Sequence, residues 1–446
     1  MTAPARRSWM IALLVGAALV MFVVGVWRAT GPGTPRYSGQ DVYYWMFQTR
    51  SSSLDDNAGL KAIGSNAVPH LTRALAIRST IFDRLAWVRK PPVQRSLSHL
   101  PVGFTWTRDT QTVRRQAAFS LLTFEAEARS ALPELHAALA DPTLENGTRQ
   151  MVVSTLLEIG LSGESVPHLL AAWPLTTNDT SSAARHDLVL ALSRVAQHAP
   201  DGCLPIFLAE LEAPDENLRL AAAWGASSLG SKAHAATPAL LRLLASTNGY
   251  SQFTAIVALG KVTSALPEVL PQLRELAHGS DDRTAAGAAL TLWRWGEPVG
   301  ETVATLTGLL SKKGGKGLAA EYLGVIGRDA ASAVPALIEA SQKDIGAWVD
   351  RYDRARCAIA VLQIAGRNEV ANKELEAALS FSGNSWVRGA VARDLGRQGR
   401  LAEPLLPALR QNLRDTDIGA RNAAAAAIES IEQAWRKVPE LEAGKR

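Results

Sequence analysis

The sequence predicts an all-α protein, an α-α superhelix preceded by one N-terminal transmembrane helix. Three observations lead to this prediction. Pairs of apolar helices recur along most of the chain, with a proline near the start of the second helix of many pairs. An uncharged apolar run occupies Trp9–Trp27. No alternation of apolar and polar residues is long enough to predict a β-sheet.

The apolar run Trp9–Trp27 has the length of a membrane span, since as a helix it would extend roughly 28 Å. Arg6 and Arg7 precede the run, whereas only Arg28 follows it directly. The positive-inside rule therefore predicts a cytoplasmic N-terminus and a periplasmic or extracytoplasmic array. A cleaved signal peptide is the alternative. Its apolar region is usually shorter, about 7–15 residues, and the residues after Trp27 make a poor cleavage site.

The sequence predicts six segments, whose boundaries follow from changes in composition. They are a cytoplasmic N-terminus (1–8), the transmembrane anchor (9–28), a linker of small and turn residues (29–36), an N-terminal capping segment (37–53), the repeat array (54–437) and a C-terminal tail (438–446). The capping segment is expected to be an amphipathic helix, because a helical array needs a polar cover at its open end.

The prolines of the predicted second helices are spaced by about one helix pair. They are Pro69, Pro133, Pro167, Pro205, Pro238, Pro271, Pro298, Pro335 and Pro404. Pro267 is an alternative to Pro271, and one copy carries Val370 and Ala371 where a proline is expected. Proline is tolerated in the first turn of a helix, because its missing N–H would have no intrahelical partner there.

The stretch Ile77–Thr112 interrupts the regular spacing and is predicted to be an insertion. Insertions in repeat proteins map to loops on one face, and Arg and Trp are common at interface hot spots. The stretch could contact a partner protein or lipid headgroups, and a solvated or self-packed loop is the alternative. The candidate contact residues are Arg84, Trp87, Arg89, Lys90, Arg95, Trp106 and Arg108.

The sequence contains no motif that predicts catalysis or a cofactor. G-x-S-x-G, S-x-x-K, G-x-G-x-x-G, C-x-x-C and H-E-x-x-H are all absent. The two cysteines, Cys203 and Cys357, lie among apolar residues and form neither a disulfide framework nor a zinc site. We therefore expect no catalytic residue, no cofactor, no metal and no small-molecule substrate.

Three local patterns are expected to be structural. His70 and His168 both occur as Val-Pro-His-Leu, which places them in the same slot of two repeats. Lys312–Gly317 is expected to be an inter-repeat turn, although it could hold an anion at the next helix N-terminus. Asp350–Arg356 alternates in charge and is expected to begin a solvated helix with local ion pairs.

The period, the paired helices and the inter-helix proline resemble the HEAT-repeat family. In that family an Asp near the turn and an Arg at the start of the next first helix form a ladder between repeats. The matching positions here are Asp141 and Arg149, Asp215 and Arg219, Asp282 and Arg283, and Asp417 and Arg421, with Arg388 in another copy. The resemblance covers roughly residues 54–437 and implies a HEAT-like solenoid of about ten repeats.

A second resemblance concerns Tyr37–Met46, which is similar to the lead-in of membrane-anchored HEAT proteins of some bacteria. It implies that the array lies on the periplasmic side of an inner membrane. Together these features predict a membrane-tethered, non-enzymatic scaffold that binds a protein partner through its repeats.

Two alternatives to the scaffold stay open. One is an enzyme on a HEAT-like scaffold, similar to the bilin lyases or the alkyl-base DNA glycosylases. The other is a peripheral binder of anionic lipid, because the formal net charge is +5. No nucleic acid partner is expected, since the basic residues are spread along the chain and the predicted topology separates the array from chromosomal DNA.

Overall fold

The computed structural model describes residues 34–48, 57–78, 109–176, 182–343 and 348–443. The chain divides into two compact units, Met1–Cys203 and Leu204–Arg446. The predicted anchor over Trp9–Trp27 lies outside the described residues, as do the N-terminus before it and most of the linker after it. Among the described helices, none combines the length and the apolar character that a membrane crossing requires.

Unit 1 begins with a small hairpin, in which β1 (Arg36–Tyr37) pairs antiparallel with β2 (Gln40–Asp41). The short helix α2 (Val42–Gln48) follows and buries Met46. The side-chain amide of Gln116, in the later helix Thr110–Leu121, donates to the carbonyl oxygen of Met46 at 2.9 Å, which fixes α2 against that helix. The segment predicted as a cap therefore contains two short strands as well as a helix.

The other helices of unit 1 form consecutive pairs. They are α3 (Ala58–Ile63) and α4 (Val68–Leu75), α7 (Thr110–Leu121) and α8 (Leu132–Leu139), α9 (Asn146–Ile159) and α10 (Val166–Ala172), and α11 (Ala183–Val195) and α12 (Pro200–Glu210). Short 3₁₀ turns join the helices of each pair, the longest being η5 (Leu122–Ala131). The boundary between the two units falls inside α12.

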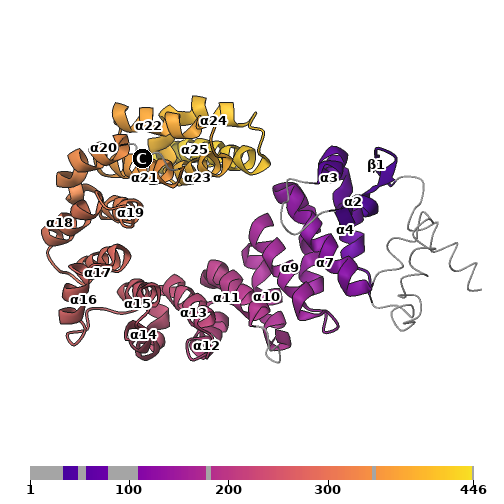
Figure 1. Cartoon of the computed structure of the whole chain (residues 1–446), viewed down its shortest axis with the longest axis horizontal. Coiled ribbons are helices and arrows are strands. Elements are labelled where there is room, and N and C mark those ends of the chain that lie inside the picture. Colours follow the sequence, from indigo (N-terminus) through magenta and orange to yellow (C-terminus); the bar gives the residue numbers. More distant parts are fainter. Residues whose placement is uncertain (1–33, 49–56, 79–108, 177–181, 344–347, 444–446) are drawn as a thin grey trace, which may run out of the picture. The chain divides into compact units, whose positions relative to one another are not determined.

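Unit 2 continues the same pattern (Figure 1). Its pairs are α13 (Glu216–Leu229) and α14 (Thr237–Leu244), α15 (Gly249–Val262) and α16 (Leu270–Ala277), α17 (Asp282–Arg294) and α18 (Val299–Leu309), α19 (Lys316–Ile326) and α20 (Val334–Gln342), α21 (Trp348–Ala365) and α22 (Glu369–Leu379), and α23 (Ser385–Gly396) and α24 (Leu406–Asn412). The long helix α25 (Ile418–Ala443) packs against α23 and α24.

The helices of unit 2 form two layers, because each first helix packs against the first helix of the next pair. Small residues let the backbones approach closely. A Cβ atom on Gly260 would lie 2.7 Å from Oγ1 of Thr291, and one on Gly396 would lie 3.0 Å from Cα of Ala427. Glycine therefore fits where a larger residue would push two first helices apart.

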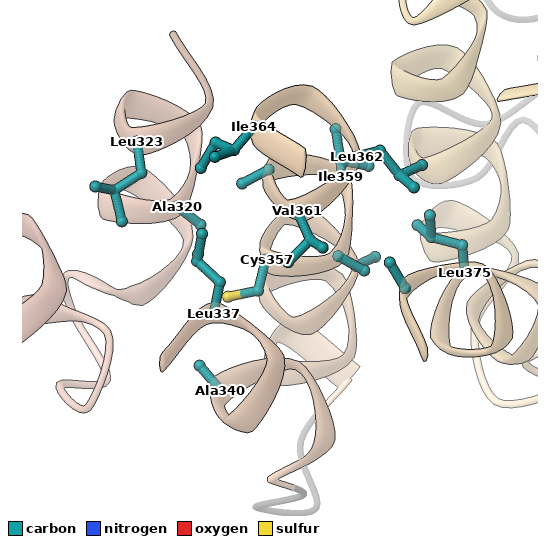
Figure 2. Close-up of a cluster of buried hydrophobic side chains, with 14 of the residues drawn as sticks. Ala320, Leu323, Leu337, Ala340, Cys357, Ile359, Val361, Leu362, Ile364 and Leu375 are labelled. Atoms are coloured by element: carbon teal, nitrogen blue, oxygen red, sulfur yellow. The ribbon is translucent and has the colours of Figure 1, made fainter. Parts of the chain in front are cut away.

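The core of unit 2 runs through successive pairs without interruption, as expected for stacked repeats. Figure 2 shows α21 at the centre of this core. Cys357 lies next to Leu337 of α20, whereas Ile359 and Leu362 lie on the side of Leu375 of α22. One helix thus supplies apolar side chains to the interfaces on both of its sides.

Most of the predicted second-helix prolines lie in a first helical turn. Those confirmed there are Pro69, Pro133, Pro167, Pro238, Pro271 and Pro335. The other three prolines do not lie in a first helical turn. Pro205 lies inside α12, which begins earlier at Pro200. Pro298 is the residue before α18, and Pro404 lies in a 3₁₀ segment while Pro407 occupies the first turn of α24. For Pro205 and Pro404, a second proline nearby, Pro200 or Pro407, takes the helix start.

Candidate functional site

The predicted contact residues of the insertion all lie outside the described residues. They are Arg84, Trp87, Arg89, Lys90, Arg95, Trp106 and Arg108. The helices on either side, α4 and α7, pack directly against each other. Nε of Arg114 in α7 donates to the carbonyl oxygen of Leu75, the last residue of α4, at 3.0 Å. The array is therefore continuous across this interruption of the sequence.

The Asp/Arg ladder exists, but its predicted pairing is wrong. Asp141 forms its ion pair with Arg114 of the preceding first helix, at 2.8 Å. Arg149 is 1% exposed and donates instead to backbone, to the carbonyl oxygens of Asp141 at 2.8 Å and Leu144 at 2.9 Å. Arg149 therefore stabilises the turn before its own helix, while the Asp141 carboxylate connects this turn to the previous repeat.

The same arrangement recurs at the other end of the array. Nε of Arg388 donates to Asp415 at 2.5 Å, and the two residues are 27 positions apart, as are Arg114 and Asp141. Arg421 donates to the carbonyl oxygen of Asp415 at 2.7 Å. Asp417, the predicted partner of Arg421, accepts from the backbone N–H of Ala420 at the helix start instead.

The two remaining predicted pairs also have other partners. Asp215 accepts from the backbone N–H of Asn217, and Arg219 donates to the carbonyl oxygens of Ala213 and Pro214. Asp282 pairs with Lys312 at 3.3 Å. An Asp beside a helix start can accept hydrogen bonds from the free N–H groups of the first turn. This explains why Asp215 binds backbone rather than Arg219.

A buried ion pair joins α19 and α21. Nζ of Lys316 donates to Oδ1 of Asp350 at 2.6 Å, and the two side chains are 7% and 4% exposed. Arg354 is also buried and donates to the carbonyl oxygen of Ser341 at 2.6 Å. The prediction of a solvated start for Asp350–Arg356 was therefore wrong at these two positions. Burial raises the pKa of the neighbouring Cys357 thiol to about 12, so the thiol stays protonated.

The histidines of two second helices in unit 1 stack on each other. The rings of His136 in α8 and His168 in α10 are 4.6 Å apart and nearly parallel, at 7°. Nε2 of His136 lies 3.1 Å from Oγ of Ser165. Burial, followed by the charge of His168, lowers the pKa of His136. In the described part of the chain, no three His, Cys, Asp or Glu side chains are grouped so that they could hold a metal ion.

Unit 1 should lose stability in mild acid because of this stack. The lowered pKa of His136 means that its stabilising contribution is complete above the unfolded-state pKa of about 6.5 and is lost as the pH falls through the folded-state pKa. We expect the thermal midpoint of the full chain to fall between pH 7 and pH 5, and the fall to be smaller in His136→Gln. His234→Gln, at an exposed histidine, is the control and should keep the wild-type slope. An unchanged slope in His136→Gln would contradict this account.

The first helices of unit 2 present a row of polar and aromatic side chains, which we call the first-helix surface. It consists of Lys261 of α15, Arg294 of α17, Glu321 of α19, Tyr352 and Arg356 of α21, and Trp386 and Asp394 of α23. An ion pair, a hydrogen bond and ring contacts join its members on α19, α21 and α23.

Tyr352 is central to the second half of this surface. Its hydroxyl donates to Oδ2 of Asp394 at 2.8 Å, and its ring meets the ring of Trp386 edge to face at 5.1 Å. Burial and the charge of Asp394 raise the pKa of Tyr352 to about 12. Arg356 lies over the Tyr352 ring and pairs with Glu321. These contacts hold Trp386 in place although its side chain is 49% exposed.

Sequence reasoning missed this surface, because its members come from five helices that are distant in sequence. One local signal was available. The side chain of Asn384 accepts from the backbone N–H of Trp386, and Asn248 does the same for Tyr250. An aromatic residue two positions after a capping Asn therefore lies in the first turn of a first helix, and both aromatic side chains are exposed.

Comparison with known proteins gives one family match and several distant structural likenesses. Residues 204–293 match the family model for HEAT repeats, whereas no curated protein matches the sequence. Human deoxyhypusine hydroxylase in complex with glycerol is 20% identical with a TM-score of 0.28, and the match covers 68% of this chain and 96% of that chain. Kap121p bound to Pho4p is 13% identical with a TM-score of 0.34, over 85% of this chain and 44% of that chain.

Kap121p bound to the extreme C-terminus of Cdc14p is similarly distant, at 13% identity and a TM-score of 0.35. This match covers 84% of this chain and 48% of that chain, so the chain spans less than half of these Kap121p structures. At such scores these likenesses carry no conclusion about activity or partner. The family match spans α13 to α17, where the structure has the helix pairs that define the repeat. Residues 204–293 therefore match the HEAT-repeat family, and the other described helix pairs repeat the same pattern.

Proposed function

We propose that this protein is a membrane-tethered, non-enzymatic scaffold that holds a protein partner against the first-helix surface of unit 2. The observation that carries the proposal is the exposed Trp386 against the half-buried Tyr352, a pair that is held in place by Asp394 and flanked by Arg356. Trp, Tyr and Arg are the residue types that dominate binding energy at protein interfaces. Their position on stacked repeats fits a surface that contacts a partner over several helices.

The tether in this proposal is the apolar run Trp9–Trp27. Its length, its lack of charge and the arginines before it support a single span with the N-terminus in the cytoplasm. The repeat array would then lie in the periplasm or another extracytoplasmic space. A tethered scaffold gains effective concentration for partners in or near the same membrane, because both molecules are confined to one surface.

Trp386→Ala is expected to reduce partner capture by the full chain in native membranes at least tenfold, because it removes an exposed hot-spot side chain worth about 2 kcal/mol or more. Capture is measured by proximity labelling from the C-terminus followed by cross-linking. The compartment of the labelled proteins tests the topology in the same experiment. Trp435→Ala is the matched control, since Trp435 is 40% exposed on α25 and outside the first-helix surface.

Three outcomes would count against the proposal. Equal loss of capture in both variants would indicate a general effect of removing tryptophan. Labelling confined to cytoplasmic proteins would contradict the predicted orientation. If the wild-type chain captures no protein at all, even after cross-linking, the scaffold function itself is wrong.

A further inference from the structure

The sequence contains two Asn-Gly dipeptides, Asn146-Gly147 and Asn248-Gly249. In such a dipeptide the backbone nitrogen of glycine can attack the asparagine side chain and release ammonia, because glycine has no Cβ that shields this nitrogen. Asn146 is the first residue of α9, whereas Asn248 precedes α15 as its N-cap and has an extended ψ of 115°. The fold therefore sets different conditions for the same chemistry at the two positions.

The carboxamide of Asn248 is held between two partners at the start of α15. Its Oδ1 accepts from the backbone N–H of Tyr250 at 2.9 Å, and its Nδ2 donates to Oε1 of Glu216 in α13 at 3.2 Å. The Tyr250 N–H thus points at the oxygen on which negative charge develops when the carboxamide is attacked, as a donor of an oxyanion hole does. The Glu216 carboxylate adjoins the nitrogen that must take up a proton before it leaves.

The turn at Asn248 is also open to water, which the second half of the reaction consumes. Asn248 is exposed, and Gly249 lines a hollow of about 440 Å³ together with Tyr250 and Ser280. Water can therefore reach the reacting atoms without any opening of the fold.

Asn146 lacks two of these conditions. It belongs to α9 itself, so ring closure there would distort a helical residue, whereas Asn248 lies just outside its helix. The Oδ1 atom of Asn146 accepts from Nη1 of the buried Arg149 at 2.9 Å. Among the hydrogen bonds of the described residues, none joins its amide nitrogen to a carboxylate. The fold therefore favours the reaction at Asn248 over the reaction at Asn146.

We propose that Asn248 is a site of spontaneous deamidation in the folded protein, that Glu216 assists the reaction, and that the product weakens the contact between α13 and α15. The nitrogen of Gly249 forms a bond to Cγ of Asn248, and the bond from Cγ to Nδ2 breaks. The proton lost by Gly249 reaches the leaving nitrogen through Glu216, so ammonia departs and a succinimide ring remains. Water opens the ring at either carbonyl and yields aspartate or isoaspartate. No group is oxidised or reduced, and this chemistry is independent of the scaffold function.

Either product changes the junction between α13 and α15. An aspartate at this position cannot donate to Glu216, and it brings a second carboxylate to the place of the amide nitrogen, where like charges repel. An isoaspartate adds a methylene to the backbone and so moves the cap away from the N–H of Tyr250. Glu216 also accepts from Oγ of Ser251 at 2.5 Å, so a shift of its carboxylate disturbs a second contact between the same two helices.

The test compares the two Asn-Gly sites within the same molecules. The full chain in detergent is incubated at neutral pH in heavy-oxygen water, which labels each opened ring, and mass spectrometry after proteolysis follows the peptides that contain Asn146 and Asn248. The same incubation in denaturant gives the rates that the local sequence alone supports.

Three variants identify the groups that take part. Glu216→Gln removes the carboxylate beside Nδ2, and Glu212→Gln is its matched control, since Glu212 is an exposed acid of the preceding turn that pairs with Arg242. Gly249→Ala shields the attacking nitrogen. A Cβ atom on Gly249 would lie 3.7 Å from the Asp281 carboxyl group, an ordinary contact, so this variant keeps the packing.

We expect Asn248 to deamidate about tenfold faster than Asn146 in the folded chain, and the two rates to become similar in denaturant. Glu216→Gln and Gly249→Ala should each slow the reaction at Asn248 about tenfold, and Glu212→Gln should change it less than about twofold. Equal rates at the two sites of the folded wild type would overturn the proposal without recourse to any variant. Equal effects of the two glutamate variants would overturn the part of Glu216.

Amide hydrogen exchange in the first turn of α15 measures the effect of the product. Asn248→Asp imitates the aspartate product, and Asn248→Ser keeps a capping side chain without its charge. We expect exchange to be about fivefold faster in Asn248→Asp than in Asn248→Ser, because only the former places two carboxylates side by side. Equal exchange in the two variants would reject the weakening of the contact between α13 and α15.

Discussion

Lys316→Met is expected to destabilise the packing of α19 against α21 by about 3–5 kcal/mol, because it leaves the Asp350 carboxylate buried without its partner. Both side chains are almost fully excluded from water. Their contact joins α19 to α21, although the two residues are 34 positions apart in the sequence. The Lys316 aliphatic chain is close in size to Met, so the loss reflects charge more than volume. Amide hydrogen exchange in α19 and α21 measures the effect locally, which matters because repeat arrays need not unfold in two states.

Two control variants make this prediction specific. Lys312→Met removes a lysine whose side chain is 51% exposed and whose contact with Asp282 is 3.3 Å long, and it should cost less than about 1 kcal/mol. The double variant Lys316→Met with Asp350→Leu should recover most of the lost stability, because no charge remains buried. If the double variant is as unstable as Lys316→Met alone, the loss comes from packing and the electrostatic explanation fails.

Arg149→Leu is expected to destabilise α9 and the turn before it by roughly 3–5 kcal/mol. The substitution removes three hydrogen bonds, two of them to backbone carbonyls and one to Asn146, and the acceptor at Leu144 stays buried while the other two are partly shielded from water. Arg149→Lys keeps the charge but cannot present several donors in one plane, so it should recover only part of the loss. The thermal midpoint and the exchange rates of the amides in α9 are the measurements.

Arg219→Leu is the matched comparison for Arg149→Leu. Arg219 occupies the same place near the start of α13 and donates to the carbonyl oxygens of Ala213 and Pro214. Its side chain is only half-buried, so water can replace the lost donors and the cost should be about 1 kcal/mol. Equal losses in the two variants would show that burial does not decide the cost and would contradict the explanation.

The repeat fold could be predicted from the sequence because its determinants are local. A proline such as Pro238 fits well in a first helical turn, and a glycine such as Gly230 ends the preceding helix with a positive φ of 59°. The periodic apolar residues between them identify the buried face. These signals act within one repeat, and so each copy could be recognised separately.

The partners of charged side chains could not be predicted, because they depend on contacts between repeats. The sequence places Asp141 in a turn and Arg149 at a helix start, but it does not show that Arg114 of the preceding first helix reaches the carboxylate first. Likewise, nothing local distinguishes the buried Asp350 from the exposed Asp281. The first-helix surface has the same origin, since Tyr352 and Asp394 meet only when α21 and α23 are stacked.

The contact between Arg114 and the last residue of α4 has a consequence for how this protein can change its length. The hydrogen bond fixes the distance between Leu75 and Arg114, so the chain between them closes a loop whose two ends are held in place. The entropy cost of closing such a loop grows with the logarithm of its length, so doubling it costs only about 0.6 kcal/mol. A protein engineer could therefore splice a reporter domain into this junction while α4 and α7 keep their packing against each other.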